Sequence, residues 1–549
     1  MKRKNILFIM CDQLRHDYLG CTGHPTIKTP NIDALAERGV LFTNTYCQAP
    51  TCGPSRNSMY TGRYVSSNGT SVLHAPLRVG EKNIGQYFGP LGVRTSLIGK
   101  SHVVPDIEGM ERLGIDPSSE IGQSIGQGGW EPYERDDGIH PDALVDPKLR
   151  YNEYLRAKGY DEQANPWHWV ANAVKTQVGI RSGYFNDSVD RPARVAEEDS
   201  ETPYMTRRAM EFIEQADADK PWLLHLSYIK PHWPYVAPAP YHEMYSKEDV
   251  IPAVRSEEEL IGANGLINNF RTRPGAKTFR EEEARKKIIP AYMGLITQID
   301  DQLGILFDFM EHRGVLENTM IVFTSDHGDY LGDHWMVDKE YFHDPAVKIP
   351  LIVVDPDAAA NCTRGTIDAD FVEGVDFLPT FLDFYDAEIP AHTLEGRSLL
   401  PKLRGQDVEW RDFAISENDY SFQSFRNAIG TPPLKCNTYM LVTKDWKYIY
   451  ASGYDEVLFD MVNDPEELVD LGTSPAHAQV RQELFNRLAK WALQYRQRTA
   501  CSEDLALKMS GIEERLGVLI GYWDEDDAKN IDPDKVPIHK SATEQFRDP

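Results

Sequence analysis

Short apolar runs, each about the length of one β-strand, alternate with helical patterns along this chain. The first run covers Lys4 to Cys11, and later runs cover Trp222–Tyr228, Met320–Phe323 and Ile349–Val354. Strands that are apolar along their whole length are typical of a sheet with helices on both faces. The alternation therefore predicts an α/β fold, in which a layered domain is built on a large, mostly parallel sheet.

Two segments between these runs carry apolar residues at helical spacing. In the first, Thr29 suits an N-cap, Pro30 suits the first helical position and Gly39 suits the end of the helix. The second has an apolar stripe over residues 299–310 and ends at Gly314. This second helix leads into the apolar run at Met320, as expected for a layered α/β domain.

Composition excludes several classes of protein. Apolar residues make up 41% and charged residues 26% of the 549 positions, which is an ordinary globular balance. The net charge of −27 argues against nucleic acid or an anionic membrane as the main partner. No apolar stretch is long enough to span a bilayer, and the run after Met1–Lys4 has no signal-peptide cleavage site. The seven scattered cysteines do not suggest a disulfide framework, so we expect a cytoplasmic protein.

The chain is expected to contain a large domain and a smaller one. We assign residues 1–430 to the α/β domain, residues 431–505 to a C-terminal subdomain and residues 506–549 to a tail that is a candidate oligomer contact. Within the large domain, residues 103–200 lack periodicity and indicate an irregular excursion that shapes a pocket or an oligomer contact. The subdomain alternates short strands with turn residues before helical periodicity returns. Its predicted elements are antiparallel strands at Tyr439–Val442, Trp446–Tyr450 and Glu456–Phe459 and a helix over Val480–Tyr495.

Two acidic residues, Asp12 and Asp326, each follow a predicted buried strand. In an open α/β sheet, ligands bind at the carboxyl ends of the strands, so both side chains would face the same crevice. With Gln13 and His327 beside them, they form a candidate site for one divalent cation. Imidazole and amide groups favour Mn²⁺ over a Ca²⁺ site made only of oxygen ligands. The plain alternative is that each acid caps a loop or a helix, and two acids on matching strand ends make it the weaker reading.

The most specific motif is Cys52-Gly53-Pro54-Ser55-Arg56, which continues as Tyr60-Thr61-Gly62-Arg63. Pro54 suits the first turn of a helix, which places Cys52 at the helix N-terminus. Backbone amides there stabilise an anion and lower the pKa of a thiol. Arg56 lies about one turn further on and can reach the same centre. The alternative is a packed cysteine before a helix.

This motif resembles the signature of the sulfatase family, Cys-x-Pro-Ser-Arg followed by Thr-Gly. The resemblance extends from Asn5 to about Leu471 and implies an alkaline-phosphatase-like three-layer α/β/α sandwich with a smaller antiparallel subdomain. It also implies that a formylglycine-generating enzyme oxidises Cys52 to formylglycine, an aldehyde that hydrates to a gem-diol. Its other landmarks are Gly99-Lys100-Ser101-His102, Lys230-Pro231-His232, Asp326-His327-Gly328, Lys339, and the strands ending Phe459-Asp460…Asp464-Pro465…Leu471.

The resemblance implies a role for each matched residue. One gem-diol hydroxyl attacks sulfur and expels the alcohol, and loss of a proton from the second hydroxyl then releases sulfate. His102 is the implied base for that release, and His232, with Lys339, the implied proton donor to the leaving oxygen. The implied charge-neutralising residues are Arg56, Lys100 and Lys339, and the implied ligands of the divalent metal (Mn²⁺ or Ca²⁺) are Asp12, Gln13, the converted Cys52, Asp326 and His327. His74 follows the signature helix, but we leave it out of the catalytic set.

Two positions depart from many sulfatases: Gln13 replaces an aspartate and His327 an asparagine. Both substitutions resemble a bacterial branch that includes phosphonate monoester hydrolases and choline sulfatases. Lys100 and His102 nevertheless keep the sulfatase pair, where phosphonate hydrolases carry uncharged residues. We therefore expect arylsulfatase-like hydrolysis of sulfate monoesters, with phosphonate monoesters or phosphate diesters as the alternative or as promiscuous substrates. Relatives in this branch are often oligomers, so a homo-oligomer is expected.

Two rival readings remain open. The chain could be a non-catalytic anion-binding protein in which Cys52 is never converted, although every matched catalytic position holds a competent residue. An enzyme of the alkaline phosphatase type with an unmodified nucleophile would require Ser or Thr at position 52. The alcohol half of the substrate is not indicated, because Trp130, Trp167 and Trp169 suit aryl stacking and core packing equally well.

Overall fold

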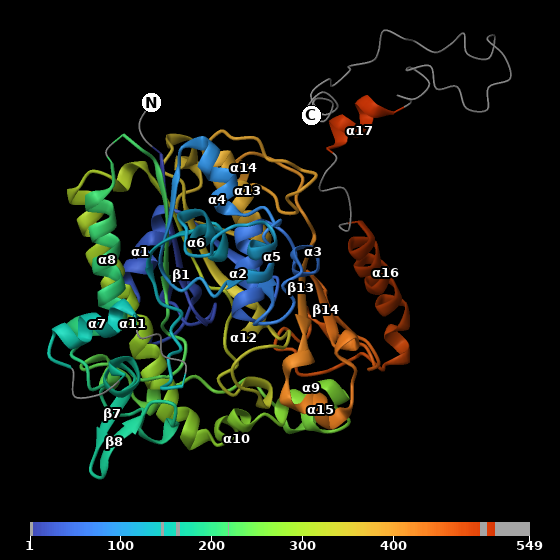
Figure 1. Ribbon diagram of the computed structural model, residues 1–549. Helices are drawn as coiled ribbons and strands as arrows, with labels where there is room; N and C mark the ends of the chain where they lie inside the picture. Colours follow the sequence, from blue (N-terminus) through green and yellow to red (C-terminus); the bar gives the residue numbers. More distant parts are fainter. Residues whose placement is uncertain (1–3, 144–147, 161–164, 218, 495–501, 511–549) are drawn as a thin grey trace, which may run out of the picture.

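A large central sheet organises the computed structural model, which describes residues 4–143, 148–160, 165–217, 219–494 and 502–510 (Figure 1). Within these residues, eight strands form one sheet in the order β12-β2-β11-β10-β1-β9-β4-β6. The strands are β1 (Asn5–Cys11), β2 (Val40–Tyr46), β4 (Arg94–Gly99), β6 (Glu131–Arg135), β9 (Trp222–Tyr228), β10 (Thr319–Thr324), β11 (Lys348–Val354) and β12 (Thr366–Glu373).

Most neighbouring strands of this sheet run parallel. β1 pairs in parallel with both β10 and β9, and the parallel register continues through β4 to β6. β11 pairs antiparallel with both of its neighbours, and β12 is parallel to β2. The predicted mostly parallel sheet is therefore confirmed, with β11 as the strand that runs against the rest.

Both faces of the central strand β1 are buried, which explains why its sequence is apolar throughout. Ile6, Phe8 and Met10 belong to the hydrophobic core on one face of the sheet, while Leu7 and Ile9 belong to the core on the other. Full burial of such a side chain contributes roughly 1.5–3 kcal/mol to folding.

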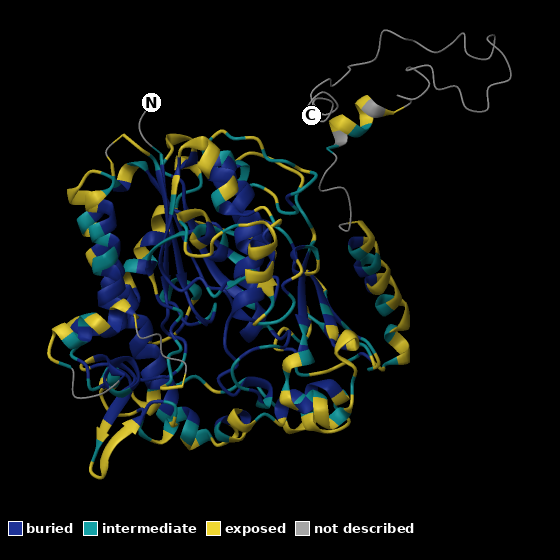
Figure 2. Cartoon of the chain, in the orientation of Figure 1, coloured by how far each residue is buried: buried dark blue, intermediate teal, exposed yellow. Residues whose placement is uncertain are grey.

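Helices supply the outer two layers of the sandwich, and the central strands between them are buried (Figures 1 and 2). The core around Leu7 includes residues of α1 (Pro30–Arg38), α8 (Glu201–Gln215) and α11 (Glu282–His312). The core around Phe8 includes residues of α2 (Cys52–Thr61), α4 (Ile84–Phe88) and α13 (Phe377–Phe384). The predicted three-layer α/β/α sandwich is confirmed.

Residues 103–200 are more regular than their sequence indicated. Their strand β6 extends the central sheet beside β4, and the segment also carries α5 (Ile107–Arg112), α6 (Glu120–Gly126), α7 (Arg150–Ala157) and a hairpin of β7 (Ala173–Thr176) and β8 (Gly179–Ser182). β6 reads Glu-Pro-Tyr-Glu-Arg, which has no apolar pattern. Proline and charged residues are tolerated because β6 is the edge of the sheet.

A separate four-stranded antiparallel sheet follows the large domain. It consists of β13 (Phe413–Asp419), β14 (Asn437–Thr443), β15 (Trp446–Ala451) and β16 (Val457–Asp460), and α16 (Ala478–Gln494) packs against it. The predicted strands and helix are confirmed within one or two residues. β13 precedes the predicted boundary at 431, while the division into domains stays a prediction. Most of the predicted tail lies outside the described residues.

The remaining elements are short. They are β3 (Pro76–Leu77), β5 (Val104–Pro105), α3 (Val65–Asn68), α9 (Gly265–Arg271), α10 (Pro274–Arg280), α12 (Asp344–Val347), α14 (Leu400–Leu403), α15 (Ser424–Ile429) and α17 (Glu503–Met509).

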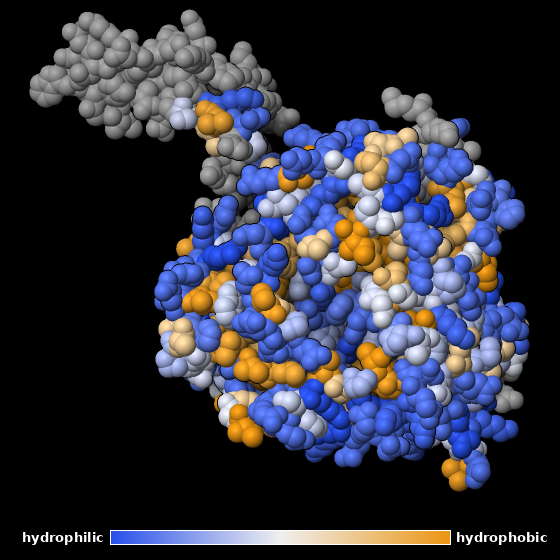
Figure 3. Space-filling view, turned by 180° about the vertical axis from the view of Figure 1, so that it is seen from behind, coloured by the Kyte–Doolittle hydropathy of each residue, from blue (hydrophilic) through white to orange (hydrophobic). Residues whose placement is uncertain are grey.

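The surface of the described region is mainly hydrophilic. Figure 3 shows that polar side chains cover most of the face seen from behind, with small hydrophobic groups between them. No helix among the described residues is both long and apolar enough to cross a membrane. The cysteines found there as free thiols are Cys11, Cys21, Cys47, Cys52, Cys362 and Cys436.

The N-terminus of α1 is capped by a residue far away in the sequence. Thr29 occupies the N-cap position, but its hydroxyl accepts the Gly20 N–H at 2.8 Å and makes no capping bond to the helix. Asp300 of α11 accepts the N–H of Asn31 at 3.2 Å and of Ile32 at 2.7 Å. A carboxylate that accepts these first-turn donors does the work of a side-chain cap and also docks α1 onto α11.

We expect Asp300→Ala to lower the free energy of unfolding by about 1–2 kcal/mol, because a buried backbone donor loses its acceptor. Urea unfolding followed by tryptophan fluorescence measures this loss. Asp308→Ala, which removes an exposed acid from the same helix, should change stability by less than about 0.5 kcal/mol. Equal stability of the two variants would show that α1 does not depend on this cap.

Candidate active site

The two acids predicted to share a crevice lie together at the carboxyl ends of β1 and β10. Asp12 follows β1 directly, and the Asp326 Oδ1 atom accepts the backbone N–H of Gln13 at 3.1 Å. The loop after Asp326 can pack this closely because residue 328 is glycine. A Cβ atom there would lie 2.0 Å from the carbonyl oxygen of Pro345.

A buried cluster of four side chains could hold a metal ion. The ligand atoms of Asp12, Cys52, Asp326 and His327 all lie within 4.8 Å of one another. The His327 Nδ1 atom is 2.9 Å from the Gly328 carbonyl, which can only accept, so Nδ1 carries the proton and Nε2 faces the cluster. Burial lowers the pKa of His327, but the Asp326 carboxylate and the neighbouring Cys52 side chain together raise it above its ordinary value. Carboxylate and imidazole ligands in this arrangement fit a divalent transition metal such as Mn²⁺.

Cys52 is the first residue of α2, as the motif predicted, and its side chain is buried among charged groups. Its Sγ atom lies 3.0 Å from His327 Nε2, 3.1 Å from Lys339 Nζ and 3.7 Å from Lys100 Nζ. Burial raises the pKa of the Cys52 thiol, but Lys100 and Lys339 bring it well below its ordinary value. A cysteine that only fills core would have apolar neighbours, so these surroundings favour a chemical role.

Arg56 is fully buried and ties three strand ends together. Its Nε–H donates to Asp326 Oδ2 at 2.7 Å, and one terminal nitrogen donates to the Lys100 carbonyl at 2.6 Å and the Ser227 hydroxyl at 2.8 Å. The other terminal nitrogen lies 3.6 Å from Asp12 Oδ2. These bonds hold the acidic pair in place, whereas direct contact of Arg56 with a substrate stays a prediction.

Lys339 is in contact with several of the predicted site residues. Its Nζ atom lies 2.9 Å from Gln13 Oε1 and 3.1 Å from both Cys52 Sγ and His232 Nε2. His232 Nδ1 is 2.7 Å from the Trp233 carbonyl, so this nitrogen is the donor and Nε2 is left to accept from Lys339. Burial and the Lys339 charge lower the pKa of His232. Together these contacts form an ammonium–imidazole pair that can pass a proton.

Lys100 and His102 enter the site from the end of β4. Gly99 has a φ of +99°, and a Cβ atom there would lie 1.9 Å from the Ser227 carbonyl oxygen. Lys100 Nζ contacts the Asp12 carboxylate. Burial raises the pKa of Asp12, but Lys100 and other nearby cations lower it below its ordinary value. His102 has a left-handed backbone (φ +53°), and its side chain helps to lower the pKa of the Cys52 thiol.

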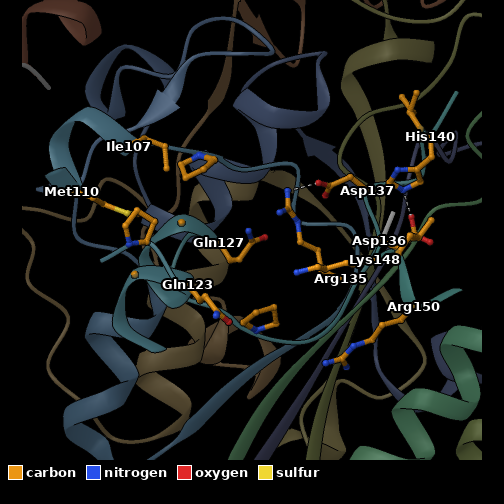
Figure 4. Close-up of a pocket in the computed structure, with 17 residues that line it drawn as sticks. Ile107, Met110, Gln123, Gln127, Arg135, Asp136, Asp137, His140, Lys148 and Arg150 are labelled. Carbon is orange, nitrogen blue, oxygen red and sulfur yellow. Dashed lines mark hydrogen bonds and ion pairs between the residues drawn. The ribbon is translucent and has the colours of Figure 1, made fainter. Parts of the chain in front are cut away.

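A cavity of about 640 Å³ lies beside the segment that carries Ser101 and His102. Two residues that line this cavity bind the segment: Asp137 Oδ1 accepts the His102 N–H at 3.0 Å, and Gln127 Oε1 accepts the Ser101 hydroxyl at 2.5 Å. Figure 4 shows Asp137 paired with Arg135 at the wall of this cavity. The cavity wall thereby supports the turn that carries His102.

All the predicted catalytic and metal-binding residues thus lie in or beside one buried site. His74 and the three tryptophans considered for substrate stacking lie elsewhere. His74 is exposed and packs on Phe422. Trp130 and Trp167 are buried in the two cores, and Trp169 donates to Asp142 at 3.0 Å.

Asp329 and Tyr235 are not among the residues predicted from the sequence, yet Asp329 binds the Gln13 side chain and Tyr235 binds Asp329. Asp329 directly follows the Asp326-His327-Gly328 motif, a position that could have marked it. No local pattern points to Tyr235, because only the tertiary fold brings it to Asp329.

Comparison with known proteins agrees with this geometry. The sulfatase family model matches residues 4–116 and 151–387, and a model described as N-sulphoglucosamine sulphohydrolase, C-terminal, matches residues 332–494. The chain is 30% identical to the multifunctional alkaline phosphatase superfamily protein PehA of Trinickia caryophylli, over 91% of this chain and 97% of that protein. It is 28% identical to an arylsulfatase of Clostridium perfringens, over 85% of this chain and 90% of that enzyme.

Solved structures include close matches to the fold. The phosphonate monoester hydrolase of Agrobacterium radiobacter superposes with a TM-score of 0.77 at 26% identity, covering 90% of this chain and 96% of that one. The phosphonate monoester hydrolase of Silicibacter pomeroyi gives the same TM-score at 25% identity and the same coverage. With a family model matched over more than half of its length, the chain belongs to the sulfatase family of the alkaline phosphatase superfamily.

Proposed function

We propose that this protein hydrolyses sulfate monoesters of the aryl type, with residue 52 as the nucleophile after conversion of Cys52 to formylglycine. The observation that carries the proposal is the environment of the Cys52 side chain. At the N-terminus of α2, its Sγ atom lies within 3.8 Å of Lys339, Lys100, His327 and Asp12. Two ammonium groups beside a nucleophile position suit an anionic ester.

A divalent ion, Mn²⁺ or Ca²⁺, is the proposed cofactor, and bound there it would supply a Lewis acid for the nucleophile and the sulfate. The residues that would hold it are Asp12, Gln13, Asp326, His327 and the converted residue 52. Their donor set fits such an ion, because carboxylate and imidazole atoms lie within 4.8 Å of one another in a buried cluster. The Gln13 carboxamide oxygen is bound to Lys339, which also contacts residue 52.

The chain's own residues divide two proton transfers at position 52 between them. Lys339 and His232 are hydrogen-bonded and can deliver a proton to the departing alcohol oxygen when the S–O bond breaks. His102 can take the proton of the second gem-diol hydroxyl, so that the hemiacetal collapses to the aldehyde and sulfate leaves. Water then restores the hydrate, and Lys100 and Lys339 balance the sulfate charge throughout.

Hydrolysis of phosphonate monoesters or phosphate diesters is the second candidate. The two phosphonate monoester hydrolase structures favour it, as do Gln13 and His327 in place of an aspartate and an asparagine. The relative PehA, which is described as multifunctional, favours activity on more than one ester class. Lys100 and His102 favour sulfate. Tetrahedral in-line displacement is common to both ester classes, so we propose promiscuous turnover of the poorer one.

Three further parts complete the proposal. Maturation requires a formylglycine-generating enzyme, because a thiol has only one nucleophilic atom and cannot form the gem-diol. We propose a homo-oligomer working in the cytoplasm, where free cysteines are stable. The net charge of −27 makes nucleic acid an unsuitable partner.

Replacing the nucleophile tests the covalent mechanism. Cys52→Ala should reduce kcat for an aryl sulfate by a factor on the order of 10⁴ or more and leave the thermal unfolding temperature nearly unchanged. Cys362→Ala, which removes an exposed thiol, should keep full activity. Mass spectrometry of the peptide containing position 52 should show the aldehyde. A free thiol there in fully active protein would rule out the formylglycine nucleophile.

Substrate preference separates the two candidates. We expect kcat/KM for 4-nitrophenyl sulfate to exceed that for 4-nitrophenyl phenylphosphonate by at least about tenfold, a difference of about 1.4 kcal/mol in transition-state stabilisation. Both activities should disappear together in Cys52→Ala if one site serves both esters. A preference for the phosphonate would make the second candidate the main activity.

A further inference from the structure

The carboxamide of Gln13 is held by hydrogen bonds at both ends. Its Nε2 donates to Asp329 Oδ2 at 2.5 Å, and its Oε1 accepts from Lys339 Nζ at 2.9 Å. The backbone of Gln13 is fixed as well, in the left-handed region (φ +65°): its N–H donates to Asp326 and its carbonyl accepts from Tyr292. The side chain therefore has one defined direction.

Asp329 is the fixed partner of this amide. It is fully buried, its Oδ2 also accepts the Tyr235 hydroxyl at 2.5 Å, and its Oδ1 accepts the Leu331 N–H at 3.1 Å. A carboxylate engaged in this way accepts hydrogen bonds only, so it accepts the NH₂ end of an amide and repels the oxygen end.

We propose that Asp329, oriented by Tyr235, is a positioning residue that sets which end of the Gln13 carboxamide faces the nucleophile and the ion site. A carboxamide can occupy nearly the same space in two flipped orientations. Only one of them presents an oxygen, which can bind a cation and accept from Lys339. The flipped orientation would point NH₂ at a metal ion and at an ammonium group, and it would leave the Asp329 carboxylate facing an oxygen.

The same contact accounts for the residue type at position 13. A carboxylate at this position would lie within hydrogen-bonding distance of the Asp329 carboxylate, in a buried place where two like charges are costly. Glutamine is the side chain that offers an oxygen to the ion and a donor to Asp329. Positions 13 and 329 therefore act as a complementary pair.

Metal affinity tests the proposal, which rests on the proposed function only for the presence of an ion at this site. Mn²⁺ is titrated by isothermal calorimetry into full-length protein in the Cys52→Ala background, so that oxidation at position 52 cannot vary. Asp329→Ala and Tyr235→Phe should both raise the Mn²⁺ Kd, the first by roughly 10–100-fold. Tyr241→Phe removes a similar tyrosine–aspartate bond elsewhere, to Asp301 at 2.7 Å, and should leave the Kd unchanged.

Placing a carboxylate at position 13 gives a sharper test, because Asp329 determines whether this change strengthens or weakens Mn²⁺ binding. If Asp329 had no influence, Gln13→Glu would add an anionic ligand and tighten Mn²⁺ binding. We expect instead that Gln13→Glu binds Mn²⁺ at least about tenfold more weakly than the double variant Gln13→Glu/Asp329→Asn. In the double variant, the amide at position 329 can donate a hydrogen bond to the carboxylate at position 13. Circular dichroism confirms that each variant is folded.

The outcomes distinguish the positioning role from the activity. If Gln13→Glu alone binds Mn²⁺ as tightly as the double variant, or if Asp329→Ala leaves the Kd unchanged, the positioning role is wrong. If the affinities shift as expected but the wild-type protein hydrolyses no sulfate or phosphonate ester, the positioning role stands and the proposed function falls.

Discussion

The buried ion pair between Arg56 and Asp326 is the interaction on which the rest of the site depends. Both side chains have no exposed surface, and isolated charges of this kind would not be tolerated in the interior. Because the same guanidinium also binds the Lys100 carbonyl and the Ser227 hydroxyl, it joins α2 to the ends of β4, β9 and β10. Removing Arg56 would leave the Asp326 carboxylate without this ion pair and would break the bonds that join α2 to the strand ends.

Cationic side chains surround the Cys52 position although the protein as a whole is acidic. The chain carries −27 overall, yet Lys100 and Lys339 lie against the Cys52 side chain, and all three residues are buried. Low dielectric and fixed geometry make these two charges count for more than many exposed acids on the surface. The proposed anionic ester is therefore compatible with an acidic protein, and Gln13, which adds no negative charge, suits its position.

Local patterns predicted the sheet, the acidic pair and the helix start at Cys52, whereas Lys100, His102, His232 and Lys339 were assigned only through the resemblance to sulfatases. β1 and β9 could be read from their apolar sequences because both faces of the central strands are buried. Asp12 and Cys52 could be assigned because one follows a buried strand and the other begins a helix. β6 could not be predicted, because an edge strand needs no apolar face and its polar sequence resembles a loop.

The sequence by itself determined the strand and helix periodicity and the helix start at Cys52, because each depends on neighbours a few positions away. Only the tertiary structure decided which partners complete the site. Arg56 pairs with Asp326 across 270 positions, and Gln13 with Asp329 across 316. Asp300 caps α1 across 268 positions. Such contacts depend on which strands and helices become neighbours in the folded domain, and no local propensity encodes that arrangement.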